Sequence, residues 1–310
     1  GIAGGGAAAW WKALERRVLP QRSVLCAIGD GANDVAMIQT AHVGIGIAGR
    51  EGSHAVRASD VSITNFGDLT RLLLLHGSFA YQRSAVVAQI SFFKSWAFCF
   101  AQVMYSRSSG YGGTSVYDPF SIAACNALLF IPITFFALNR AVPISTLLQR
   151  PELYREKADS KLLNLSTILT WFMRALFQSV VTYVLVDGAL SSSLFPQGHV
   201  PSYSEVAVAS FCIFLLIQCG NLCLETTTFT CLQLLALAFG LVGSLMFYTL
   251  FNDSIKAQKL VDYHAVFHLC SSPTALLLLP LASVAALGPV VALKYTAPDR
   301  VAEAVALEKV

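Results

Sequence analysis

The stretch Ile28-Gly29-Asp30-Gly31-Ala32-Asn33-Asp34-Val35 places two carboxylates, Asp30 and Asp34, four residues apart on a glycine-rich turn. The apolar run 23–28 before it is typical of a buried parallel strand, and residues 34–41 after it are expected to form a helix. Mg²⁺ is usually held by one or two carboxylates plus a substrate phosphate, so Asp30 and Asp34 are suitable ligands. The alternative interpretation is a plain turn in which Asp34 caps the helix.

Two further short runs, 43–48 and 61–63, are rich in β-forming residues and are bounded by Gly and Asp. The order strand, loop, helix, strand, strand predicts part of an open α/β sheet over residues 1–76. This part is too short for a complete domain of that kind, so we expect half a domain.

The remaining sequence is strongly apolar. Of all 310 residues, 55% are hydrophobic and only 13% are charged, against about 25% charged in ordinary soluble domains, and the mean hydropathy is +0.61. A membrane-spanning helix needs about 20 apolar residues. Six stretches reach this length, which predicts a membrane all-α domain with six transmembrane helices at 80–105, 118–139, 163–186, 205–224, 229–250 and 274–294.

Loop charges orient these spans. Residues 140–161 contain five Lys and Arg residues, whereas 187–204 contain none, so the first of these loops is expected in the cytosol. The N-terminal part and the C-terminus are then cytosolic as well. Lys256 and Lys259 fall on the outer side in this scheme and count against it.

Other features exclude several classes of protein. The net charge of +3 is spread over loops without a basic run, so nucleic acid is not expected as a partner. The eight cysteines have no metal-ligand or disulfide spacing and are expected to be buried thiols. No signal peptide is indicated, and without an initiator Met the chain is expected to be the tail of a longer protein.

Few ionisable residues lie inside the apolar stretches. Lys94 falls within the first, and Asn126 on the second is placed to add a hydrogen bond, which makes both candidates for a lipid path. Snorkelling to the membrane interface is the alternative for Lys94. Arg174 in the third stretch is expected to anchor a cytoplasmic helix end. Ion pumps need carboxylates deep in the bilayer, whereas Asp118, Asp187 and Glu225 fall at helix ends.

Gly29-Asp30-Gly31-Ala32-Asn33-Asp34 is similar to the hinge motif of P-type ATPases, whose phosphorylation domain has a haloacid-dehalogenase-like fold. The resemblance implies that Asp30 and Asp34 hold Mg²⁺ and that Asn33 and Asp34 support the phosphoryl site. The runs 42–52 (HVGIGIAGREG) and 58–60 (ASD), together with Phe92-Phe93-Lys94 and Ser271-Ser272-Pro273, resemble the phospholipid-transporting P4 class, the flippases.

That resemblance implies an ATP-driven translocase that moves phospholipid to the cytoplasmic leaflet through an aspartyl-phosphate intermediate. It also implies the cofactors ATP and Mg²⁺, an accessory beta subunit of the CDC50 type, and a plasma or Golgi/endosomal membrane. Residues 77–296 would hold spans five to ten, and 297–310 a cytoplasmic tail. Ser95 and Gln178 depart from the family pattern, which commonly has Asn and His there.

The phosphorylated Asp-Lys-Thr-Gly-Thr segment of P-type ATPases does not occur in this sequence, nor does a nucleotide-binding domain. No catalytic nucleophile is therefore assigned, and the isolated 310 residues are expected to be inactive. Two alternatives remain open, a P-type cation-transporting ATPase and an inactive truncated membrane remnant.

Overall fold

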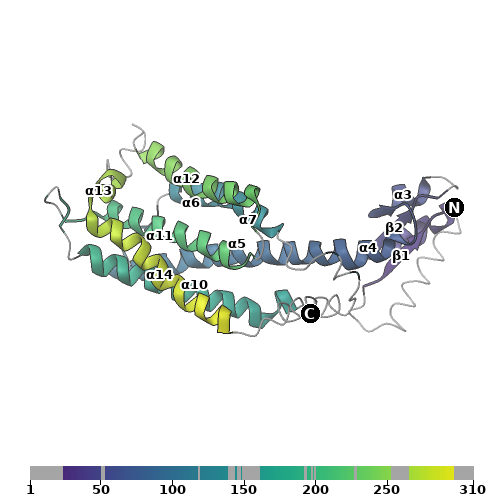
Figure 1. The fold of residues 1–310 in the computed structure, drawn as a ribbon, viewed down its shortest axis with the longest axis horizontal. Coiled ribbons are helices and arrows are strands. Elements are labelled where there is room, and N and C mark those ends of the chain that lie inside the picture. Colours follow the sequence, from purple (N-terminus) through teal and green to yellow (C-terminus); the bar gives the residue numbers. More distant parts are fainter. Residues whose placement is uncertain are drawn as a thin grey trace, which may run out of the picture. The chain divides into compact units, whose positions relative to one another are not determined.

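The computed structural model describes residues 24–49, 53–117, 119–138, 144, 148, 161–191, 194–196, 198, 200–226, 229–252 and 265–296 (Figure 1). The expected tail at 297–310, Asp118, Lys256, Lys259 and most of the basic loop at 140–161 lie outside these residues. The described chain divides into two compact units, one ending at Ser78 and one beginning at Phe79. Each unit is described by itself below.

The first unit is a small α/β layer. It contains β1 (Cys26–Gly29), a 3₁₀ turn (Ala32–Asp34), α2 (Val35–Thr40), β2 (Val43–Ile47), α3 (His54–Ala58) and β3 (Val61–Ile63). The strands are parallel in the order β1-β2-β3, with Ile28 opposite Ile45 and Ile45 opposite Val61. Strand, helix and strand follow the order expected from the sequence, with the first strand beginning three residues later than expected.

Two glycines in β2 explain how closely the helices pack on this sheet. A Cβ at Gly44 would lie 2.6 Å from Ile38 Cγ2 of α2, and one at Gly46 would lie 2.8 Å from the Ala55 carbonyl of α3. Residues two apart in a strand face the same side, so α2 and α3 cover the same face of the sheet. Crossover connections between parallel strands are right-handed, so two successive connections along the order β1-β2-β3 place their helices on the same face.

A continuous helical segment follows the sheet. It comprises α4 (Asp68–Arg71), a π-helical stretch (Leu72–Gly77) and α5 (Ser78–Ser108). The second unit then contains α6 (Pro119–Leu128), α7 (Phe130–Ala137), a 3₁₀ turn (Lys161–Leu163), α10 (Leu165–Ser191), α11 (Tyr203–Leu224), α12 (Cys231–Asn252), α13 (Ala265–Ser271) and α14 (Pro273–Thr296).

Four described helices are long and apolar enough to cross a membrane, at Asp68–Ser108, Leu165–Ser191, Tyr203–Leu224 and Pro273–Thr296. The other two expected spans contain shorter apolar helices, Cys125–Ala137 and Cys231–Phe247. The unit is thus an α-helical membrane region with several candidate spans, and the count of six stays a prediction.

The second expected span, 118–139, is interrupted at Leu129, between α6 and α7. Pro132 has no N–H to donate to the carbonyl four residues before it, that of Leu128, so the regular ladder breaks at this point. Gly240 of α12 lies against the break, because a Cβ there would be 2.8 Å from Pro132 Cγ and 3.5 Å from the Leu128 oxygen. This interruption was not predicted from the sequence.

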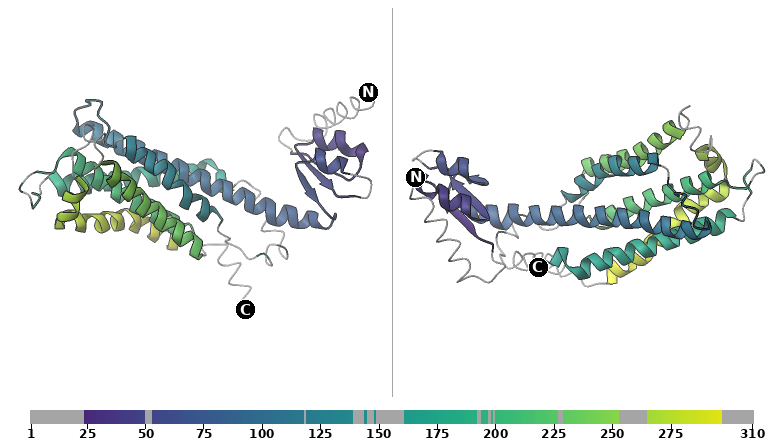
Figure 2. Two further views of the ribbon diagram at one scale, coloured as in Figure 1. Left: turned by 90° about the horizontal axis from the view of Figure 1, so that it is seen from above. Right: turned by 180° about the vertical axis from the view of Figure 1, so that it is seen from behind.

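The helices of the second unit pack in two groups, and α11 contacts helices of both (Figures 1 and 2). α10 and α11 both lie along α14, while α6 and α7 lie along α12. α5 contacts its neighbours through aromatic side chains: Phe93 meets Trp171 of α10 edge to face, and Phe98 meets Phe214 of α11 with ring centroids 4.5 Å apart. These rings belong to one apolar core of the membrane unit.

Candidate functional site

The glycine-rich turn after β1 is closed by the carboxylate of Asp34. Its Oδ2 accepts hydrogen bonds from the backbone N–H groups of Asp30, at 3.1 Å, and Gly31, at 3.3 Å. Gly29 allows this closure, since a Cβ at that position would lie 2.4 Å from Asp34 Cβ. Asp34 stands at the N-cap position of α2 but makes no side-chain cap bond to that helix, because its carboxylate bonds back into the turn instead.

The same turn fits a magnesium ion. Asp30 and Asn33 are exposed at the carboxyl end of β1, and Asp34 is half-buried beside them. Among the residues that the structure describes, no group of three His, Cys, Asp or Glu side chains could enclose a metal. Mg²⁺ needs no such enclosure, because it commonly keeps its waters and takes one or two carboxylates plus phosphate. Asp30, the exposed carboxylate of the turn, and the half-buried Asp34 stay predicted ligands.

Lys94 and Asn126 meet within the membrane unit. Lys94 Nζ donates a hydrogen bond of 2.7 Å to Asn126 Oδ1, joining α5 to α6. The two expected lipid-path residues thus lie together, and Lys94 is half-buried. Ser95, the next residue, donates to the Ser91 carbonyl of its own helix, so it takes no part in this pair. A cation and a carboxamide side by side between helices can bind an anionic or polar group.

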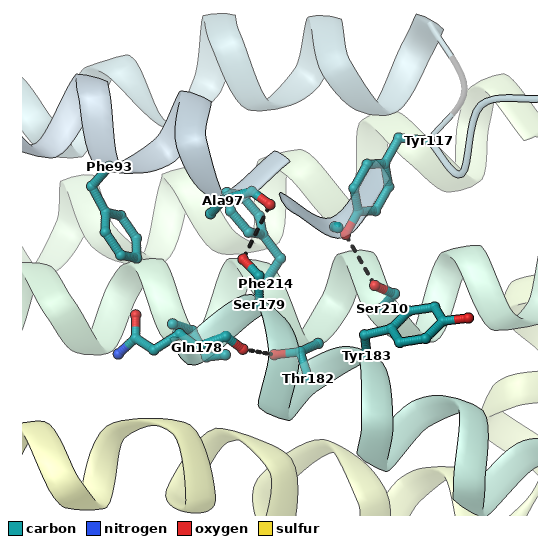
Figure 3. Close-up of a pocket in the computed structure, with 11 residues that line it drawn as sticks. Phe93, Ala97, Tyr117, Gln178, Ser179, Thr182, Tyr183, Ser210 and Phe214 are labelled. Carbon is teal, nitrogen blue, oxygen red and sulfur yellow. Dashed lines mark hydrogen bonds between the residues drawn. The ribbon is translucent and has the colours of Figure 1, made fainter. Parts of the chain in front are cut away.

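A small cavity of about 20 Å³ lies close by, between α5, α10 and α11 (Figure 3). Its lining includes five hydroxyl-bearing residues: Tyr117, Ser179, Thr182, Tyr183 and Ser210. Ser179 Oγ donates to the Ala97 carbonyl at 3.2 Å, and the Tyr117 and Ser210 hydroxyls are 3.0 Å apart. The cavity is large enough for about one water molecule.

A polar network joins α10, α11 and α14 at one end of the unit. Arg174 donates to Glu225 Oε1 at 2.9 Å and to Asn221 Oδ1 at 2.5 Å, and its guanidinium lies over the Trp171 ring. Lys294 of α14 lies 3.3 Å from the other Glu225 oxygen. Arg174 is therefore more than a terminal anchor.

Gln178 extends the network. From the sequence it was known only as a departure from the family pattern. Its amide nitrogen lies 3.3 Å from both Asn221 Oδ1 and the Ala286 carbonyl, and its amide oxygen accepts from Asn221 Nδ2 at 3.0 Å. Two polar residues four apart at the end of an apolar stretch, Asn221 and Glu225, were the sequence signal that could have indicated such a network.

Comparison with known proteins decides the family. A family model described as the C-terminal region of phospholipid-translocating P-type ATPases matches residues 56–298. This chain belongs to that family. The match covers the described membrane unit, including Lys94, Asn126 and the network around Arg174.

Individual phospholipid-transporting ATPases agree with this. The chain is 37% identical over 270 residues to phospholipid-transporting ATPase 2 of Arabidopsis thaliana, covering 87% of this chain and 24% of the relative. Phospholipid-transporting ATPase IH of Homo sapiens is 32% identical over 238 residues, which is 75% of this chain and 20% of the relative. Phospholipid-transporting ATPase DRS2 of Saccharomyces cerevisiae is 30% identical over 246 residues, 77% and 18% respectively.

The chain therefore spans at most 24% of the length of these relatives, and it corresponds to the C-terminal region of a phospholipid-translocating P-type ATPase. Its apolar helices make it part of a multi-pass membrane protein. The resemblance inferred from the glycine-rich turn and the flanking motifs is confirmed at the level of the family.

Proposed function

We propose that this chain is the C-terminal region of an ATP-driven phospholipid translocase that moves lipid from the outer or lumenal leaflet to the cytoplasmic leaflet. The observation that carries the proposal is the Lys94–Asn126 hydrogen bond inside a membrane unit of this family. Placing an ammonium in the bilayer interior costs free energy, and ionisable residues found there usually have a function. With a carboxamide beside it, Lys94 can bind the phosphate and polar groups of a passing lipid.

The first unit has the ATP-linked role in this proposal. Residues 1–76 would form the C-terminal part of a haloacid-dehalogenase-like phosphorylation domain, whose aspartyl phosphate forms on a residue outside this sequence. Asp30 and Asp34 would hold Mg²⁺, which when bound neutralises phosphoryl charge. Asn33 would orient the phosphate, and Asp34 also keeps the turn closed through its bonds to the backbone of Asp30 and Gly31.

The second unit has the transport role. Six spans within 77–296, with residues 1–76 and 297–310 in the cytosol, are proposed on the grounds of apolar length and loop charge. The plasma membrane and the Golgi or endosomal membranes are the proposed locations. The outward loops around Tyr111 and Pro201 would meet an accessory beta subunit of the CDC50 type; Tyr111 is 78% exposed and has a positive φ of 59°.

The family match and the position of carboxylates support lipid over cation transport. Among the described residues, the carboxylates of the spans lie near helix ends: Asp187 four residues before the end of α10, Glu205 in the first turn of α11, and Glu225 just after it. Dehydrating a small cation needs oxygen ligands near the bilayer centre. In α5 the ionisable residue far from both helix ends is instead a cation, Lys94.

Phospholipid-stimulated ATP hydrolysis by the purified full-length protein tests the proposal. Phospholipid, and not Na⁺, K⁺ or Ca²⁺, should stimulate hydrolysis, while the isolated 310 residues should hydrolyse nothing. Lys94→Met should weaken stimulation at least about tenfold, because a charge-assisted bond contributes about 1.5–3 kcal/mol. Arg107→Met, which replaces an exposed cation in the last turn of α5, is the matched control and should behave as wild type.

Stimulation by a cation without any lipid effect would favour the ion-pump alternative. A full-length protein that hydrolyses no ATP under any of these conditions would favour the inactive remnant.

A further inference from the structure

Gln218 of α11 is a buried carboxamide without a hydrogen-bond partner among the described residues. Its side chain is 0% exposed, and neither Nε2 nor Oε1 has a donor or acceptor in reach. Burying an amide without partners costs about 1–3 kcal/mol even by protein mutational measures. Such a group in a native structure needs an explanation, and an ordered water or other ligand is the usual one.

Ring contacts give the relative direction of α5 and α11. Phe98 packs against Phe214, and Tyr105 packs against Tyr203 with centroids 5.1 Å apart. Moving forward along α5 therefore means moving backward along α11, so the two helices are antiparallel. The two contacts are seven residues apart on α5 and eleven apart on α11, so the register near Lys94 is taken from the Phe98–Phe214 contact alone.

One turn from the Phe98–Phe214 contact, this register places Lys94 at the level of Gln218. Lys94 precedes Phe98 by four residues and Gln218 follows Phe214 by four, so each lies on the same helix face as its aromatic neighbour. Both steps lead in the same direction, because the helices are antiparallel. Asn126 bonds Lys94 at this level, which adds α6 to the helices that meet there.

The groups at this level have complementary hydrogen-bonding capacity. An ammonium has three donors, and among the described residues Lys94 uses one of them, toward Asn126 Oδ1. Gln218 offers an acceptor oxygen and two donors. The cavity of about 20 Å³, which is large enough for a water, lies next to this level: it is lined by Phe93 and Ile217, the sequence neighbours of Lys94 and Gln218, and by neither of these two residues.

We propose that Gln218 is the third polar residue of the Lys94–Asn126 site, and that ordered water bridges its carboxamide to the Lys94 ammonium. Gln218 is then a positioning residue: it holds the ammonium between α5, α6 and α11 and leaves Asn126 to bond it directly. The inference deepens the proposed lipid path, since it adds α11 to the elements that hold the lysine.

A double-mutant cycle in the purified full-length protein in lipid nanodiscs tests the inference without relying on transport. The variants are Gln218→Met, which keeps the side-chain length but has no amide, Lys94→Met, and both together. Gln218→Met should lower the thermal unfolding midpoint, and the double variant should lose less than the two single losses combined. Gln178→Met, whose amide has visible partners in Asn221 and Ala286, is the positive control and should also lower the midpoint.

The opposite results would overturn the inference. If the carboxamide is an orphan, Gln218→Met removes an unsatisfied buried group and should raise the midpoint or leave it unchanged. Additive losses in the cycle would likewise separate Gln218 from Lys94. If Gln218→Met does not accumulate, Gln218→Glu replaces it: its carboxylate should be tolerated beside Lys94 and should destabilise the protein in the Lys94→Met background.

Two further readouts separate positioning from general packing. A cryo-EM map of the same sample should show ordered density between Gln218 and Lys94, and an empty gap there would count against the water. Gln218→Met should also raise the phospholipid concentration for half-maximal ATP hydrolysis about two- to tenfold, with the maximal rate kept. If phospholipid does not stimulate the wild type, the proposed function fails, whereas the midpoints and the map still decide the role of Gln218.

Discussion

At the scale of single residues, the two carboxylates of the glycine-rich turn have different surroundings. Asp34 accepts two backbone hydrogen bonds from the turn and lies in contact with Gly29, whereas Asp30 is exposed at the end of β1. The Asp34 carboxylate therefore stabilises the turn, whereas the Asp30 carboxylate makes neither of these two bonds. Substituting each should have a different effect.

We expect Asp30→Asn to raise the Mg²⁺ concentration needed for half-maximal ATP hydrolysis by at least about tenfold in the full-length protein, because a neutral amide binds a hard cation poorly. Its unfolding midpoint should stay near that of wild type. Asp34→Ala should lower the midpoint, since two N–H groups of the turn lose their acceptor at about 1 kcal/mol each.

The control for this pair is Asp68→Asn. The Asp68 carboxylate, in the same unit, accepts hydrogen bonds from the Thr64 hydroxyl and the Asn65 backbone N–H. An amide oxygen can accept the same two bonds. An Asp30→Asn protein with an unchanged Mg²⁺ dependence would remove Asp30 from the metal site.

Sequence alone indicated the residues of the turn because all of them lie within one octapeptide, whose spacing is chemically informative. Lys94 and Asn126 were both predicted as lipid-path residues on neighbouring spans, but the hydrogen bond between them was not predicted. The partners of Arg174 were not, since Glu225 and Asn221 are 51 and 47 residues away. Hydropathy gives the length of a helix but not its rotation, so it cannot pair side chains over such separations.

At the scale of elements, the break between α6 and α7 and the close approach of α12 belong together. Pro132 frees the Leu128 carbonyl, and Gly240 has no side chain to keep α12 away from this point. Small residues allow such close packing of helices in membranes. Apolar length predicted the segment but not its interruption, because hydropathy averaged over the stretch does not show the missing N–H of Pro132; the proline itself was the sequence signal for a break.

Gly240→Val should destabilise the full-length protein by about 1–3 kcal/mol, because added methyl groups must displace Pro132 of the opposite helix, 2.8 Å from the new Cβ. Gly243→Ala is the matched control one turn away, where the nearest atom, a Leu128 methyl, is 3.8 Å from the new Cβ. Thermal unfolding in nanodiscs compares the two. Equal midpoints for both variants would show that α12 does not pack as closely as the structure has it.

At the scale of the membrane unit, Glu225 bridges two cations from two other helices. Arg174 of α10 and Lys294 of α14 each contact one of its oxygens, and the Arg174 side chain is only 11% exposed. The consecutive helices α10 and α11 are thereby joined at one end to α14, which is distant in the sequence. Removing a carboxylate that lies between two cations lowers the stability most where it leaves a buried charge unpaired.

We expect Glu225→Gln to cost about 2 kcal/mol of stability, because the buried guanidinium of Arg174 loses its charged partner. Lys294→Met should cost less than about 1 kcal/mol, since Lys294 is 39% exposed and the pair is partly screened by water. Unfolding midpoints of the purified full-length protein measure both. A larger loss for Lys294→Met than for Glu225→Gln would contradict this account of the network.

The central claim is that the full-length protein moves phospholipid by means of the Lys94 site. The most direct test is the ATP-dependent transfer of fluorescent phospholipid to the leaflet facing the ATP-hydrolysing domain, measured in liposomes that contain the purified full-length protein. We predict transfer by the wild type and by Arg107→Met, and strongly reduced transfer by Lys94→Met. Transfer that is unchanged in Lys94→Met would place the lipid path elsewhere, and ATP-driven cation uptake without lipid transfer would contradict the claim itself.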